Sequence, residues 1–224
     1  MRPIDIFYQE SLKHFKESEG NDDEYKWLVG ARLALFNSYK KELNLRFKLL
    51  NELCKKVRGR VLDVGSGSGF PALTFSLLDN VKKVIGIEKR SEYSDFLSKL
   101  EKKNEKLRFI YVDFLKLPTN LGKFDSVVFF YILHDFEPET YLNKAVEFLS
   151  PGGQLLIADF DIKGLRENCK IFCRDRDLEI VEDKIIGSAN THGVVASAFV
   201  LIIQRKDRSK YLKEPPGGFE PPTC

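Results

Sequence analysis

A short apolar segment that runs into three closely spaced glycines, residues 61–70 (VLDVGSGSGF), constrains this chain more than any other stretch. Its apolar half predicts a buried strand, and its glycines predict a tight turn before a helix. Glycine tolerates positive φ and lets a ligand approach the backbone closely. The N–H groups at a helix start favour polar or anionic ligand groups. We therefore expect a nucleotide-like small molecule at the end of this strand.

The spacing of the glycines separates the candidate ligands. Dinucleotide-binding turns follow G-x-G-x-x-G, in which the third glycine lets helix and strand pack closely; Phe70 occupies that position here. No G-K-[ST] follows the turn, so a phosphate-binding P-loop is not indicated. The sequence instead reads G-x-G-x-G, with Asp63 shortly before the first glycine. This pattern resembles motif I of the class I S-adenosylmethionine (SAM) dependent methyltransferases.

Further segments resemble the same family, in the order in which it carries them. They are strand-like stretches with the residues that end them, at 83–88, 108–114, 124–131 and 149–157. An acid at the second strand tip, about 20 residues past a glycine turn, is well placed to bind ribose hydroxyls. Agreement among several independent segments is stronger than any one motif.

The resemblance implies SAM as the cofactor and S-adenosylhomocysteine as its product. In this family the acid at the second strand tip holds both ribose hydroxyls, and Glu88 is the match. The resemblance also puts Asp113 beside the adenine amino group and Phe114 near the adenine ring. The cofactor-binding residues implied in this way are Asp63, Gly65, Ser66, Gly67, Gly69, Glu88, Lys89, Asp113, Phe114 and Tyr131.

Alternating strands and helices predict a parallel sheet with right-handed crossovers. The short loop 187–193 between the last two strands permits only an antiparallel pair. By resemblance, the fold is a doubly wound α/β sheet of seven mostly parallel strands, in the order 3-2-1-4-5-7-6, with the last strand antiparallel and helices on both faces. We expect N-terminal helices over 1–57 that form a substrate lid, a SAM-binding domain over 58–206, and a disordered tail over 207–224.

In this fold the acceptor meets the methyl group near the end of the fourth strand, here residues 131–136 (YILHDF). That stretch resembles the I-L-H-D-W segment of small-molecule O-methyltransferases, although we do not expect their large N-terminal dimerisation domain here. His134, with Asp135 beside it, is the candidate general base for a hydroxyl, because the pKa of histidine lies near working pH. The alternative is that His134 and Asp135 cap the following helix or line the cofactor pocket.

The favoured function is methyl transfer to a small-molecule acceptor through a hydroxyl, a carboxyl group or a carbon atom, by a cytoplasmic monomer or homodimer. The chain has no N-P-P-[YF] run, which argues against methylation of exocyclic adenine amines or glutamine amides. An RNA or protein methyltransferase that uses a basic helix over 39–60 is the alternative, as is a non-catalytic SAM-binding or NAD-binding module.

Composition narrows the partners further. The net charge of +3, with many charges of both signs, gives no global nucleic-acid footprint. The four cysteines are scattered and indicate neither a disulfide framework nor a metal site. No apolar run approaches the roughly 18 residues of a membrane span, so no membrane partner is expected.

Overall fold

The computed structural model describes residues 40–174, 176–191 and 193–206 of the 224-residue chain. Of the N-terminal lid expected over 1–57, only the last helix and the turn after it fall inside these ranges. The lid therefore stays a prediction. The tail expected to be disordered, 207–224, lies outside the described residues, so that expectation also stays a prediction.

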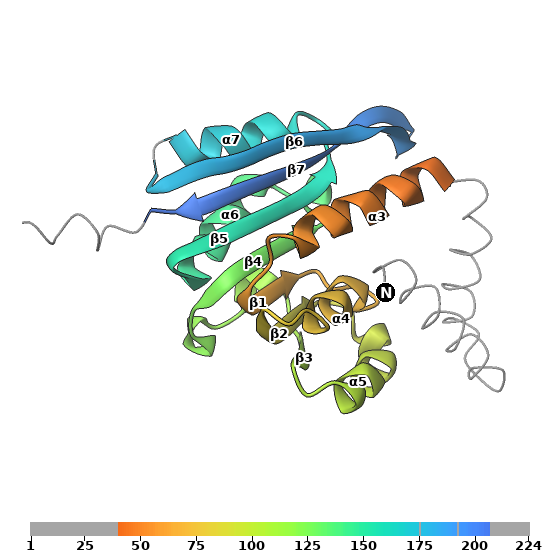
Figure 1. Cartoon of the computed structure of the whole chain (residues 1–224), viewed down its shortest axis with the longest axis vertical. Coiled ribbons are helices and arrows are strands. Elements are labelled where there is room, and N and C mark those ends of the chain that lie inside the picture. The colour runs from red at the N-terminus through yellow and green to blue at the C-terminus, as the bar shows by residue number, and fades with distance from the viewer. Residues whose placement is uncertain (1–39, 175, 192, 207–224) are drawn as a thin grey trace, which may run out of the picture.

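One sheet of seven strands forms the centre of the molecule, in the order β3-β2-β1-β4-β5-β7-β6 (Figure 1). The first five strands run parallel, whereas β7 runs antiparallel to both β5 and β6. The predicted strand order and the antiparallel last strand are therefore confirmed. The strands are β1 (Gly59–Val64), β2 (Val81–Glu88), β3 (Leu107–Tyr111), β4 (Phe124–Phe130), β5 (Leu149–Phe160), β6 (Leu178–Thr191) and β7 (Val194–Arg205).

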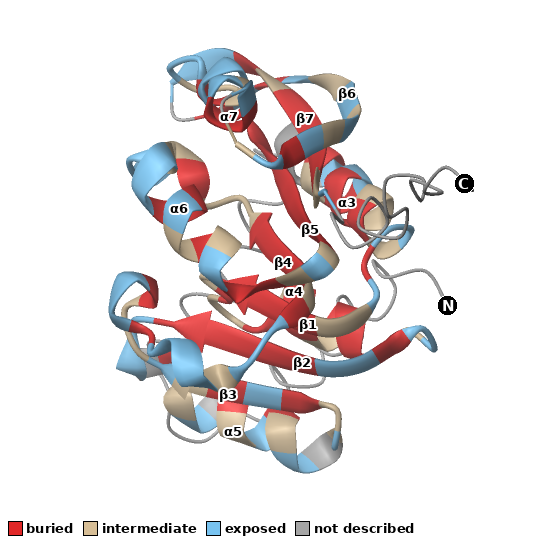
Figure 2. Ribbon diagram, turned by 90° about the vertical axis from the view of Figure 1, so that its left-hand side faces the viewer, coloured by how far each residue is buried: buried red, intermediate tan, exposed pale blue. Residues whose placement is uncertain are grey.

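Helices cover both faces of the sheet, and each face has its own apolar core (Figure 2). One core is closed by α3 (Lys40–Cys54), α4 (Phe70–Ser76) and α5 (Ser94–Lys103). The other is closed by α6 (Pro138–Phe148) and α7 (Leu165–Arg174). This arrangement confirms the doubly wound α/β fold.

The central strands are continuous apolar runs because both of their faces are buried. Successive side chains of a strand point to opposite faces. In β1, Val61 accordingly lies in the core beneath α3, while Leu62 lies in the core beneath α6. Val128 and Val127 of β4 divide between the two cores in the same way. Each central strand thus supports two helical layers.

The basic helix expected over 39–60 is shorter than predicted, because α3 ends at Cys54. Gly59 opens β1 with φ at 63°, a conformation that no helix can continue. A side chain at this position would also collide with the carboxylate of Asp125. The basic residues that follow Cys54 therefore lie in a turn and at the start of a strand, and do not extend one helix face.

The final hairpin is also longer than predicted. Most of the loop expected over 187–193 is strand, since β6 continues to Thr191, which pairs with Val194. The small and polar residues of this stretch lack the apolar alternation of a strand, and backbone pairing with β7 holds them. Two register shifts in β6 let the long strand bend while it keeps this pairing.

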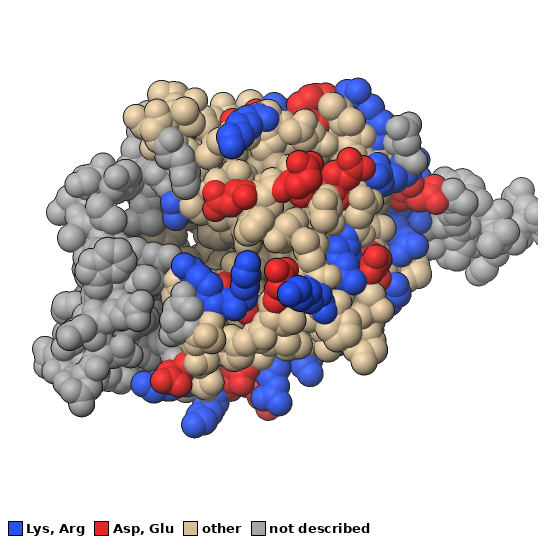
Figure 3. Space-filling model, turned by 180° about the vertical axis from the view of Figure 1, so that it is seen from behind, with Lys and Arg blue, Asp and Glu red and all other residues tan. Residues whose placement is uncertain are grey.

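Three lysines near the end of α3 lie close to acidic side chains. Glu52 accepts hydrogen bonds from Lys55 at 2.5 Å and from Lys184 at 2.8 Å, and Lys56 lies 2.6 Å from Glu182. On the face that carries α6 and α7, positive and negative side chains are interspersed (Figure 3). Within the described residues, no helix is both long enough and apolar enough to cross a membrane.

Candidate active site

The glycine turn follows β1 at the edge of the sheet where the parallel strands end. Gly65, Gly67 and Gly69 all have positive φ, at 72°, 52° and 74°. The turn is fastened to the neighbouring strand, because the N–H groups of Gly65 and Ser66 both donate to the carbonyl of Ile87, at 2.8 and 2.9 Å. The predicted strand–turn–helix geometry is present, and its backbone needs glycine at three alternate positions.

The three glycines face different surroundings. A side chain at Gly65 would collide with Ile132, and one at Gly69 would collide with Leu97 of α5. A side chain at Gly67, in contrast, would meet no atom within 4 Å. The outer two glycines therefore permit close packing of the protein on itself. The middle one faces open space, where a ligand can approach the backbone.

Asp63 is buried beneath this turn, with 1% of its surface exposed. Ser66 Oγ donates a hydrogen bond to its Oδ2 at 2.8 Å. Burial raises the pKa of the Asp63 carboxyl to about 7; the hydrogen bond from Ser66 opposes this rise, and the nearby Glu88 adds to it. Asp63 thus links the glycine turn to the end of β1 and carries a proton near neutral pH more readily than an ordinary aspartate.

Glu88 ends β2 directly beside the glycine turn and is 6% exposed. Its Oε2 accepts the N–H of Gly67 at 2.6 Å, and its Oε1 accepts the N–H of Arg90 at 2.9 Å. A carboxylate has about four acceptor positions, so both oxygens retain capacity for further donors. The predicted role of Glu88 in binding the ribose of SAM fits this geometry, because a ribose presents two adjacent hydroxyl groups that can donate hydrogen bonds.

At the tip of β3, Asp113 and Phe114 have different surroundings. Asp113 accepts the backbone N–H two residues further on at 3.0 Å, and Lys89 Nζ lies 4.0 Å from its Oδ2. The Phe114 ring is 4% exposed and stacks on Tyr141 with a centroid separation of 5.8 Å. The side chains of Asp113 and Lys89 thus reach solvent at this edge of the sheet, whereas the Phe114 ring belongs to the apolar core. Its contact with adenine stays a prediction.

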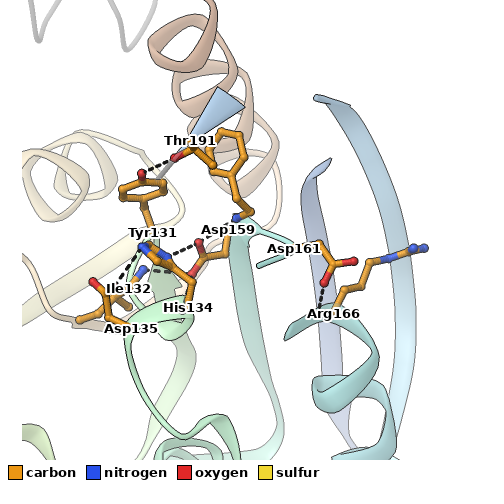
Figure 4. Close-up of polar contacts among 9 residues, drawn as sticks. Tyr131, Ile132, His134, Asp135, Asp159, Asp161, Arg166 and Thr191 are labelled. Atoms are coloured by element: carbon orange, nitrogen blue, oxygen red, sulfur yellow. Dashed lines mark hydrogen bonds and ion pairs between the residues drawn. The ribbon is translucent and has the colours of Figure 1, made fainter. Parts of the chain in front are cut away.

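Tyr131, His134 and the side chains that contact them are called the acceptor edge. This edge begins where β4 ends, at Tyr131 (Figure 4). Tyr131 has φ at 54°, which is uncommon for a residue with a side chain. Its hydroxyl lies 3.0 Å from Thr191 Oγ1 at the end of β6, and its ring centroid lies 4.7 Å from that of His134. The guanidinium of Arg46, from α3, lies 3.4 Å from the centroid of the Tyr131 ring.

His134 lies in a 3₁₀ turn after β4 and forms a buried pair with Asp159 of β5 (Figure 4). Its Nδ1 is 2.7 Å from Asp159 Oδ1, and the two side chains are 2% and 0% exposed. A carboxylate can only accept, so the proton of the neutral ring lies on Nδ1 and the lone pair on Nε2. This is the arrangement that a general base needs.

Asp159 is held in place by the backbone around it. Its Oδ2 accepts the N–H of Ile132 at 3.1 Å and that of His134 at 3.4 Å, while its Oδ1 accepts the N–H of Phe160 at 2.8 Å. Sequence reasoning missed this residue. The available signal was an aspartate inside an otherwise apolar strand, because such a carboxylate must be paired when it is buried.

The pKa of His134 lies above its ordinary value. Burial lowers it, but the hydrogen bond and the charge of Asp159, together with the charge of Asp135, raise it by more; Arg46 opposes the rise. The Asp135 side chain is 62% exposed, and its Oδ1 lies 3.6 Å from His134 Nε2. Both predicted catalytic residues therefore lie at the edge, with His134 buried and Asp135 facing solvent. Their catalytic role stays a prediction.

The described residues contain no group of three or more His, Cys, Asp or Glu side chains that could hold a metal ion. The residues around the glycine turn, called the donor edge (Asp63, the three glycines, Glu88 and Asp113), offer hydrogen-bonding groups. The acceptor edge offers a histidine. Gly65 lies between the two edges, because a side chain at this position would collide with Ile132, which lies two residues before His134. A molecule seated over the glycine turn therefore lies next to the residues that follow β4.

Two proteins that are similar to this chain in sequence are named as methyltransferases. An uncharacterized methyltransferase of Geobacillus kaustophilus is 28% identical over 159 residues, which cover 70% of this chain and 66% of the relative. The 27-O-demethylrifamycin SV methyltransferase of Amycolatopsis mediterranei is 30% identical over 117 residues, which cover 50% of this chain and 43% of the relative. The matched region thus spans about two thirds or less of the length of these two relatives.

A solved structure shows the same fold. The N-methyltransferase NodS of Bradyrhizobium japonicum, in complex with S-adenosylhomocysteine, has a TM-score of 0.61 at 16% identity and covers 87% of this chain and 98% of its own. The model of the family described as a methyltransferase domain matches residues 55–212, which is more than half of the chain. The predicted family is confirmed, and with it SAM as the cofactor. The chain belongs to the class I SAM-dependent methyltransferases.

Proposed function

We propose that this protein transfers a methyl group from SAM to a hydroxyl oxygen of a small molecule, with His134 as the general base. The observation that carries the proposal is the buried contact of 2.7 Å between His134 Nδ1 and Asp159 Oδ1. A histidine that only capped a helix would not need a buried carboxylate behind its ring. The placement of this pair beside the glycine turn supports a role in the reaction.

The residues of the donor edge suit SAM. Glu88 offers carboxylate oxygens to the ribose hydroxyls, Gly67 leaves the space for close approach, and Asp113 lies at the next strand tip. When bound, SAM supplies a methyl group that is already activated by its positively charged sulfur. The protein therefore has to align the acceptor in a dry site and accept one proton.

His134 performs the proton transfer in this proposal. Its Nε2 takes the proton of the acceptor hydroxyl while the oxygen bonds to the methyl carbon and the bond from that carbon to sulfur breaks, so that the ring becomes an imidazolium and S-adenosylhomocysteine is the leaving group. Asp159 stabilises that cation through Nδ1 and holds the ring in one orientation. Since the side chain of His134 is 2% exposed, the proton moves in a site shielded from bulk water.

A small molecule suits the surface better than RNA does. The cations Lys55, Lys56 and Lys184 lie within 3 Å of acidic side chains, so they do not form an open row for phosphates. The face with α6 and α7 also mixes both signs of charge (Figure 3). The relative that methylates 27-O-demethylrifamycin SV supports an oxygen acceptor on a small molecule.

Calorimetric titration with SAM, followed by transfer of a labelled methyl group, tests the proposal. We expect SAM to bind and a panel of hydroxylated aromatic compounds to become labelled, with loss of transfer but not of binding in His134→Ala. Labelling of tRNA that weakens steeply with salt would favour the RNA methyltransferase. Binding of SAM without transfer to any acceptor would favour a non-catalytic module.

A further inference from the structure

We propose that Thr191 is a positioning residue of the methyl transfer, which holds Tyr131 against His134 and thereby keeps the proposed base fixed and shielded from water. The inference rests on the proposed function, because it assigns a residue that acts on the base of that reaction. It also gives the last hairpin of the sheet a part in the active site. Thr191 lies at the end of β6, and 2% of its surface is exposed.

The contact between Thr191 and Tyr131 joins parts of the sheet that are not adjacent. In the strand order, β5 and β7 lie between β4 and β6. The hydroxyl oxygens of the two residues are nevertheless 3.0 Å apart, and either hydroxyl can donate (Figure 4). The end of β6 therefore bends back towards the residue that follows β4.

The residues of β6 allow this bend. Two register shifts interrupt its pairing with β7, the second directly before Gly187, and bulges of this kind bend a strand and increase its twist. Gly187 then passes close to α3, because a side chain at this position would lie 2.8 Å from Leu45 Cδ2. A glycine here lets the hairpin pack against α3, and the strand continues from it to Thr191.

Tyr131 depends on such support because of its backbone. Its φ of 54° is uncommon for a residue with a side chain, and such a conformation persists only where the surrounding contacts hold it. The backbone N–H donates to the carbonyl of Ala158 at 2.8 Å, and the ring packs edge-to-face with Phe160, with centroids 5.6 Å apart. Both contacts are with β5. The Thr191 hydroxyl instead holds the far end of the side chain and so fixes where the ring points.

The ring held in this way lies against His134. The centroids of the two rings are 4.7 Å apart, and the His134 side chain is 2% exposed. Asp159 holds the imidazole through Nδ1, at 2.7 Å, while Tyr131 restrains the tilt of the ring and covers it. Proton transfer depends on a lone pair that is aimed at the acceptor hydroxyl. A loosened Tyr131 should therefore slow the transfer without weakening SAM binding.

Two measurements on the full chain test the inference. The first is the rate at which the Nδ1 proton of His134 exchanges with water, followed by NMR on the free protein. The second is steady-state transfer to the hydroxylated aromatic compound that is labelled best. We expect Thr191→Val to speed the exchange and to lower kcat, each about tenfold, with the KM of the acceptor and the Kd for SAM unchanged. Thr191→Ser keeps the hydroxyl and should behave like the unmodified protein.

Three further variants serve as matched comparisons. Tyr131→Phe removes the other hydroxyl but keeps the ring, so it should reproduce Thr191→Val, and the double variant should lose nothing more. Ser188→Ala removes a hydroxyl from an exposed position of β6 and should change neither measurement. Leu178→Ala removes a buried side chain at the other end of the strand; it should lower the melting temperature and leave the exchange at His134 unchanged.

The outcomes separate this inference from the proposed function. If Thr191→Val lowers only the melting temperature, the contact merely fastens the hairpin and the inference is overturned. Equal losses in Thr191→Ser would overturn it as well, as would faster exchange in Leu178→Ala, because the effect would then reflect general instability. Normal turnover in His134→Ala, together with faster exchange in Thr191→Val, would count against the proposed function and leave the positioning of the His134 ring by Thr191 standing.

Discussion

The donor edge and the acceptor edge of this site are built in different ways. The donor edge is formed by two short segments, the glycine turn with the buried Asp63 beneath it and Glu88 at the end of the neighbouring strand, which are joined mainly through backbone N–H groups. The acceptor edge is formed by side chains from α3, β5, β6 and the segment after β4, which meet at Tyr131 and His134. The donor edge thus joins two neighbouring strand ends through the backbone, whereas the acceptor edge brings together side chains from four segments.

This difference predicts that SAM binding and methyl transfer depend on different residues. If the two edges are independent, changes at the donor edge alter the affinity for SAM, whereas changes at the acceptor edge alter the rate of transfer. Residues far apart with no shared partner usually have additive effects, while residues of one network do not. The following predictions test how sharply the separation holds.

The largest effect is expected for His134→Ala. Loss of the general base should lower kcat by roughly 100-fold, with the Kd for SAM unchanged. Single-turnover transfer to the best acceptor, with SAM affinity measured by calorimetry, checks this. Ile171→Ala, an exposed change on α7, is the control. Normal turnover in His134→Ala would remove it as the base and leave its pairing with Asp159 as a structural feature.

Glu88→Ala should give the next largest effect, at the donor edge. Removal of a carboxylate that accepts ligand hydroxyls should raise the Kd for SAM by roughly 50-fold. The kcat at saturating SAM should change little, and Glu88→Gln should be intermediate because it keeps one acceptor oxygen. Equal losses in affinity and in kcat would show that the two edges are coupled through the glycine turn.

Asp159→Asn should change the pH dependence. His134 must be neutral to accept a proton, so activity should rise with pH through a pKa above the ordinary value of histidine. Loss of the anionic partner removes the main cause of the raised pKa of His134, so the midpoint of the pH–rate profile should move to lower pH. The kcat should also fall about tenfold. A pH–rate profile for both proteins decides the point. An unchanged midpoint in a folded variant would contradict a positioning role for Asp159.

The smallest effect is expected for Asp63→Asn, and it concerns stability. The pKa of Asp63 in the folded state is about 7, which is above its ordinary value. At pH values between the ordinary pKa and the folded one, the folded state therefore binds more protons than the unfolded state. Stability is therefore lost as pH rises through this window. The variant should melt about 3 °C higher at pH 8 and show no such gain at pH 4. Asp79→Asn, at an exposed position, serves as the control; a gain at both pH values would contradict the titration of Asp63.

Much of the fold was predictable because its signals are local. Apolar runs bounded by glycine turns identify strands buried on both faces, and their alternation with helices implies parallel crossovers. The errors occurred where backbone context decides. The helix expected over 39–60 ends at Cys54 ahead of the turn to Gly59, and β6 continues to Thr191 through pairing with β7, although its residues there are small and polar.

The sequence by itself predicted the donor edge, because a glycine turn after one strand and an acid at the tip of the next strand are short motifs that can be read in order along the chain. It also pointed to His134. Only the tertiary structure decided which side chains meet there, since Asp159, which contacts His134, is 25 positions away and Thr191 is 60 positions from Tyr131. Such contacts form when the sheet assembles, because its register brings the ends of β4, β5 and β6 to one edge and places α3 over them.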